Sequence, residues 1–191
     1  MPSLQTMMQK ALKWRTSGGQ ATGGTGIFTF SPIERALRTG HAYLDNLYDA
    51  SLEQDEYMEL GITTATDHAS VLREIEVSCT NELVELRLYE DATYVEAGTG
   101  KQTNMNRNEA ATHPSVVDVT DRPTVSVQGV PILVQVYNGQ DSFNADPLVH
   151  AHFTWPIALK DDTQYILRLT HLGASTGTAS VTILRCECPY E

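Results

Sequence analysis

The sequence predicts an all-β fold, an antiparallel β-sandwich that is jelly-roll-like and carries an extended N-terminal arm. After residue 40 the chain consists of about ten short runs rich in β-branched and aromatic residues, with turn residues between them. The same region has almost no helical periodicity, which is typical of antiparallel sandwiches. The length of 191 residues suits one well-buried domain. We therefore expect an arm over residues 1–32 and a β-sandwich body over 33–191.

The arm has three predicted parts. Residues 3–15 place apolar side chains at roughly helical spacing, which indicates a short amphipathic helix. Residues 17–26, SGGQATGGTG, have the composition of a flexible tether. Residues 27–32, IFTFSP, alternate as an edge strand that ends at a proline. That strand would pair either with another chain or with its own body, and the sequence leaves both open.

The body is predicted to consist of strands joined by short connections, apart from a long loop over residues 97–114 that is rich in Gly, Asn and Thr. The order of the strands in the sheets does not follow from the sequence. The expected strands are 41–49, 56–62, 69–79, 82–90, 115–120, 123–127, 130–138, 148–155, 164–172 and 178–187.

Alternation within these runs predicts which side chains are buried. Residues 69–79 place Val71, Arg73, Ile75, Val77 and Cys79 on a mostly apolar face.

The run at 82–90 repeats this pattern with Val84, Leu86 and Leu88. Its short separation from 69–79 indicates a hairpin, and GASTG indicates a second hairpin-like connection between the last two strands.

The charge distribution limits the possible partners. A formal net charge of −11 argues against nucleic acid, because phosphate binding depends on Lys and Arg. Residues 1–39 nevertheless hold five basic residues against Glu34 alone. A basic arm beside an acidic body favours docking of the arm onto an acidic neighbour.

The sequence predicts a protein of a soluble compartment. No run of about 18 apolar residues could cross a membrane, and the N-terminus lacks a signal-peptide stretch. The cysteines Cys79, Cys186 and Cys188 are odd in number, so we expect reduced thiols.

We expect neither an enzyme nor a cofactor, because the sequence shows no nucleophile with a base and no phosphate-binding loop. His150 and His152 share a strand face, as some metal ligands do, but the sequence names no third ligand. Cys186 and Cys188 lack the spacing of zinc or redox motifs, and residues 45–56 lack the rhythm of a calcium loop. The sequence therefore predicts no metal site.

The leading partner-binding candidates lie in the arm, where large apolar side chains have little of their own to bury against. They are Met7, Met8, Lys10, Leu12, Lys13, Trp14, Arg15, Phe28 and Phe30.

Three stretches together resemble the capsid decoration, or cement, proteins and related head proteins of tailed bacteriophages. The stretches are IERALRTGHAYLDNLYDAS (33–51), ELVELRLYEDATYVEAGTGKQTNMNRN (82–108) and LKDDTQYILRLTHLGASTGTASVTI (159–183). Their motifs are a GHAY-like strand, an ELxLYE strand with an NxNRN segment, and an xTxYxLRxTN-like strand before a Gly-rich hairpin. The C-terminal RCECPYE (185–191) departs from the aromatic final strand of that group, and residues 1–31 match none of its patterns.

The resemblance implies a structural virion protein, made in the host cytoplasm, often trimeric, and seated on the capsid exterior. It would bind the major capsid protein and neighbouring copies. The alternative is a glycan- or receptor-binding fibre or tail module, because sandwich folds host both roles.

Overall fold

The fold is described from a computed structural model, which covers residues 32–80, 83–94, 102–105, 114–138, 149–153, 156–174 and 176–189. The chain divides into two units, residues 1–32 and 33–191, and the description concerns the second. The arm predicted from the sequence lies outside the described residues, apart from Pro32.

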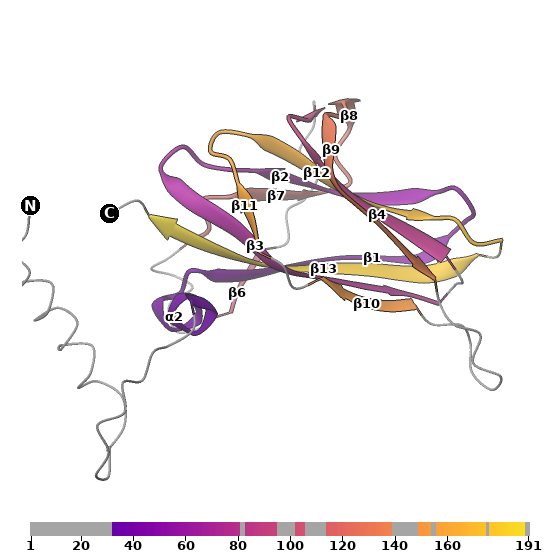
Figure 1. The fold of residues 1–191 in the computed structure, drawn as a ribbon, viewed down its shortest axis with the longest axis horizontal. Helices are drawn as coiled ribbons and strands as arrows, with labels where there is room; N and C mark the ends of the chain where they lie inside the picture. Colours follow the sequence, from indigo (N-terminus) through magenta and orange to yellow (C-terminus); the bar gives the residue numbers. More distant parts are fainter. Residues whose placement is uncertain are drawn as a thin grey trace, which may run out of the picture. The chain divides into compact units, whose positions relative to one another are not determined.

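Two antiparallel sheets face each other as layers (Figure 1). Sheet A holds, in spatial order, β10 (Val149–Phe153), β3 (His68–Cys79), β13 (Gly177–Pro189), β1 (Ala42–Leu52) and β6 (Gln102–Asn104), with β11 (Ile157–Leu159) also paired to β3. Sheet B holds β7 (Asp118–Asp121), β2 (Tyr57–Thr63), β12 (Gln164–His171), β4 (Leu83–Glu90) and β9 (Val130–Asn138). A small separate ladder joins β5 (Thr93–Tyr94) to β8 (Val125–Val127). The predicted all-β sandwich is confirmed.

The strand order is that of a jelly roll, in which consecutive strands alternate between two sheets. The chain crosses from sheet A to sheet B and back through β1, β2, β3 and β4, and again through β9, β10, β12 and β13. Both predicted hairpins are therefore wrong. β3 lies in sheet A while β4 lies in sheet B, and β12 and β13 are separated in the same way. A short connection can turn the corner between facing sheets as well as join neighbours in one sheet.

The core lies between the two sheets. Val84, Leu86 and Leu88 of β4 are fully buried there, as their alternation predicted. They meet Val181 and Ile183 of β13 in one cluster. Burial of each such side chain contributes about 1.5–3 kcal/mol, so this inner layer holds the two sheets together.

A bulge changes which face of β3 is buried. Ile75, Val77 and Cys79 face the core as predicted, but Leu72 is buried and Val71 is only partly so. The pairing with β13 shifts at Arg73, because Leu184 lies opposite Glu74 while Arg185 lies opposite Leu72. An extra residue in one strand moves the side chains beyond it to the other face.

A helix that the strand pattern does not predict, α2 (Pro32–Thr39), precedes β1. Its Ala36 packs on Ala42 and Cys186, so it covers part of the outer face of sheet A. Pro32 at its first position, Glu34 in its first turn and Arg38 in its last turn are ordinary helix signals. The predicted 97–114 loop also contains structure, because β6 pairs with β1.

Gly129, at the turn into β9, should tolerate no side chain. Its φ is +81°, and an added Cβ would lie 2.2 Å from the Glu90 carbonyl oxygen. We expect Gly129→Ala to lower the free energy of unfolding by about 1–3 kcal/mol, measured by urea denaturation. Thr124→Ala, an exposed position in the same segment, is the control and should change it little. Equal effects of the two substitutions would contradict this explanation.

Candidate interaction surface

The partner-binding residues predicted from the sequence cannot be placed, because all of them lie outside the described residues. These are Met7, Met8, Lys10, Leu12, Lys13, Trp14, Arg15, Phe28 and Phe30. The surface that the described residues do show is in the body, at the outer edge of sheet B.

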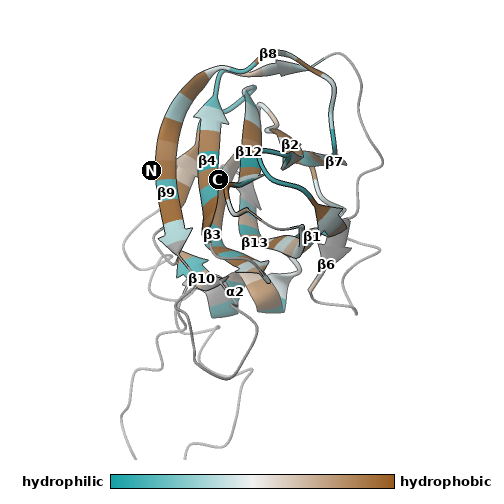
Figure 2. Ribbon diagram, turned by 90° about the vertical axis from the view of Figure 1, so that its right-hand side faces the viewer, coloured by the Kyte–Doolittle hydropathy of each residue, from teal (hydrophilic) through white to brown (hydrophobic). Residues whose placement is uncertain are grey.

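β9 forms that edge and exposes a stripe of apolar side chains. Ile132, Val134 and Val136 are 44%, 47% and 54% exposed and alternate along the strand; we call them the β9 stripe. Val130, at the start of the strand, is 62% exposed. Figure 2 shows brown, hydrophobic segments along β9 at the side of the sandwich. A single exposed valine is ordinary on a protein surface, but an apolar row on an edge strand is usually covered.

The inner face of the same side is also incompletely covered. Leu133 and Tyr137 of β9 and Ala151 and Phe153 of β10 pack against the core but remain partly exposed. β9 and β10 are edge strands of their respective sheets and contact each other. This side of the body is therefore apolar on both faces of β9.

Charged residues on the outer face of sheet B neutralise one another in pairs. Arg168 lies directly opposite Arg87 across the ladder. Like charges in that position repel, but Arg168 bonds Glu59 at 2.6 Å and Arg87 bonds Glu85 at 2.7 Å. The guanidinium of Arg168 also stacks 4.2 Å from the centre of the Tyr57 ring. The two arginines and two glutamates therefore have no net charge together. Val134 of β9 lies opposite one of them, Arg87.

The two histidines considered as metal ligands lie on β10, opposite Ser78 and Glu76 of β3. The His152 ring nitrogen is 3.4 Å from a Glu74 carboxylate oxygen, and both side chains are substantially exposed. Within the described ranges, no group of three or more His, Cys, Asp or Glu side chains could hold a metal ion.

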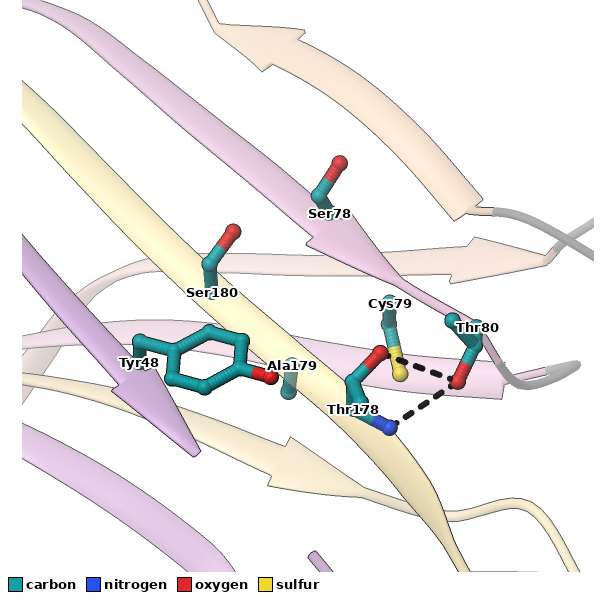
Figure 3. A pocket seen from close by; sticks show the side chains of 7 residues that line it. All are labelled: Tyr48, Ser78, Cys79, Thr80, Thr178, Ala179 and Ser180. Carbon is teal, nitrogen blue, oxygen red and sulfur yellow. Dashed lines mark hydrogen bonds between the residues drawn. The ribbon is translucent and has the colours of Figure 1, made fainter. Parts of the chain in front are cut away.

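A shallow pocket lies at one end of sheet A, between β1, β3 and β13 (Figure 3). Tyr48, Ser78 and Ser180 contribute hydroxyl groups to its lining. Thr178 donates its backbone N–H to the Thr80 hydroxyl at 2.9 Å. The volume of about 60 Å³ is far below the roughly 300–1,000 Å³ of typical small-molecule sites.

A buried ion network closes one end of the core. The Arg185 Nε donates to Asp45 at 2.8 Å, and its guanidinium also pairs with Glu187. Glu187 accepts from the Ser115 hydroxyl at 2.6 Å and from the Val116 N–H at 2.9 Å. Burial raises the pKa of Asp45, and the charge and hydrogen bond of Arg185 oppose that rise. The network ties the segment before β7 to β1 and β13.

Loss of Arg185 should destabilise the fold strongly. Arg185→Met leaves two carboxylates buried without their counter-charge, so we expect a loss of about 3–5 kcal/mol in the free energy of unfolding, measured by urea denaturation. Arg122→Met is the matched control, because Arg122 pairs with Asp49 at the exposed surface and should cost less than about 1 kcal/mol. Similar losses in both variants would show that the buried network does not hold this end of the core.

A second polar cluster joins β4 to the turn before β12. Lys160 bonds Glu90 at 2.5 Å, and the Tyr165 hydroxyl donates to Glu90 at 3.1 Å. The hydrogen bond from Lys160 is the main cause that lowers the pKa of Glu90 below its ordinary value. Burial is the main cause that raises the pKa of Tyr165, to about 12.

Because the pKa of Glu90 is lowered, its contribution to the free energy of unfolding depends on pH. A carboxyl whose pKa is lower in the folded state stabilises the fold above its ordinary value and loses that contribution as pH falls through the folded pKa. Below about pH 4.5, Glu90→Gln should therefore lose less stability per pH unit than the wild type, as read from urea midpoints. Asp67→Asn, which alters an exposed carboxylate, should follow the wild type. An acid dependence unchanged by Glu90→Gln would contradict the assignment.

The sequence contains a signal for the β9 surface that residue alternation alone does not reveal. Residues 123–138 contain no charged residue, although the chain holds 24 acidic and 13 basic ones. An expected strand without any charge is a candidate for a covered edge, because natural edge strands usually carry charged side chains.

Two comparisons with known proteins find no match, and a third finds a weak structural likeness. No protein family model matches the sequence, and no curated protein matches it. Among solved structures, a chain of Desmodium yellow mottle tymovirus aligns over 92% of this chain and 97% of its own, with 7% identity and a TM-score of 0.27. That likeness is too weak to establish a common fold or function. In the described part of the chain, no helix is long and apolar enough to cross a membrane.

Proposed function

We propose that this chain is a structural virion protein that sits on the exterior of a tailed-phage capsid and stabilises the shell. It would do so by binding the major capsid protein and neighbouring copies, as a homotrimer or another assembly of copies. The observation that carries the proposal is the apolar, uncharged edge of the body at β9. Such an edge is a site for pairing with another chain, and its burial stabilises an assembly without any catalytic group.

The fold supports this role without deciding it. Jelly rolls are common in viral capsid domains, and they also occur in lectins. The stretches that resemble decoration proteins include α2, β1, β4, β12 and much of β13. They also include β5 and the edge strand β6, so the resemblance covers both central and peripheral elements of the body.

The N-terminal arm supplies the second proposed contact. The arm contains basic and aromatic residues, Trp14 among them. Such residues would bind an acidic or apolar groove on a capsid neighbour. The glycine-rich stretch over 17–26 would act as a flexible linker that lets these residues bind at a distance from the body.

A glycan- or receptor-binding tail module is the second candidate, because lectins share the jelly roll. The two candidates place the chain differently, on the shell or on the tail. Localisation on the particle therefore separates them.

The test is electron microscopy of purified particles, combined with deletion of residues 1–31 from the viral gene. We expect density for the body on the outside of the shell, and particles that lose infectivity at lower temperature when the arm is absent. Thr22→Ala within the tether is the control and should leave heat resistance unchanged. Particles that lack the chain, or that keep full occupancy and heat resistance without the arm, would contradict the proposal.

A further inference from the structure

We infer that β9 is the contact between two copies of this chain, which align their β9 strands antiparallel and join their B sheets into one continuous sheet. This rests on the proposed structural role and specifies one of its contacts. It can nevertheless be tested on the isolated protein.

The charge distribution favours a second copy as the occupant of this edge. Two copies that each carry a net charge of −11 repel one another over most of their surfaces. β9 has no charged residue, and the nearest arginine on the face, Arg87, is neutralised by Glu85. Charge repulsion therefore opposes self-association least at β9. A basic partner attracted by the acidic body would find no carboxylate on β9.

The sequence of the strand is self-complementary under a two-fold axis. An axis through Val134 places Val134 beside its counterpart and Ile132 beside Val136 of the second copy, so every member of the β9 stripe meets another member. Cross-strand pairs of β-branched side chains stabilise antiparallel sheets. Shifting the register by two residues places one member of the stripe opposite Asn138 or Val130, outside the stripe, so only the axis through Val134 pairs the stripe wholly with itself.

The backbone of β9 is suited to this pairing. Among the strands that the structure describes, β9 forms a ladder only with β4. The ladder is regular from Leu133 to Asn138, and Ile132 is the extra residue where the pairing shifts between Leu133 and Pro131. Proline donates no hydrogen bond, but an axis through Val134 places it at the end of the new ladder.

The first experiment measures self-association of the full chain by sedimentation equilibrium over a range of concentrations. We expect the wild type to form dimers or larger assemblies, and Val134→Glu to weaken self-association by about tenfold or more, because it places two like charges directly opposite each other across the axis. Ala50→Glu adds the same charge at an exposed position in β1, on the other sheet, and should associate like the wild type. A monomeric wild type, or equal association of the two variants, would overturn the inference.

The second experiment tests the register and does not depend on a charge. Under mild oxidation, Val134→Cys should form a disulfide-linked dimer, because residues at the axis bring their Cβ atoms close enough. Ala50→Cys should remain uncrosslinked. Both variants carry Cys188→Ser, and the other native cysteines, Cys79 and Cys186, are buried. Equal crosslinking of the two variants would overturn the register.

A third variant separates this contact from one made by the arm. If residues 27–31 of a neighbour occupied β9 instead, Phe28→Asp with Phe30→Asp would abolish association, and the inference would be wrong. We expect this double variant to associate like the wild type. Dimers that depend on Val134, formed by a chain that is absent from virus particles, would support the β9 contact and contradict the virion role.

Discussion

The structure depends on burying the inner faces of two sheets against each other. Each central strand has one apolar face, and neither sheet could exclude water from that face alone. Leu86 and Leu88 from sheet B meet Val181 and Ile183 from sheet A in a single cluster. Because consecutive strands alternate between the sheets, most of these contacts join residues far apart in the chain. The two layers should therefore form together rather than separately.

Two places depart from this simple division into apolar interior and polar surface. At one end of the core, Arg185 is buried with Asp45 and Glu187, and this network fixes the segment that begins at Ser115. Buried ion pairs often add little net stability over an apolar core, but they restrict how neighbouring segments can pack. At the side of sheet B, the β9 stripe is apolar and exposed. The first departure is satisfied within the chain, whereas the second is left uncovered by the described residues and is where we propose a contact with a second copy.

The proposed role follows from that difference. An acidic body repels its own copies except where its surface carries no net charge, and β9 is such a place. A structural protein of a shell needs specific contacts of this kind rather than a reactive group. The arm would add reach, since it combines basic and aromatic residues with a glycine-rich tether.

The sequence by itself determined the fold class, the positions of the ten expected strands, and the buried face of residues 82–90 and of most of 69–79. It succeeded at Val84, Leu86 and Leu88, because alternation is a local property that one buried face imposes on each strand. It failed at Leu72, where a bulge inverts the faces, and at both expected hairpins. Only the tertiary structure decided that β3 and β4 belong to different sheets, that Arg185 meets Asp45, and that β9 lies at an edge. Those facts depend on pairing between segments that are distant in the sequence. The charge-free run at 123–138 indicates an exposed apolar edge only because β9 has no second neighbour among the described strands.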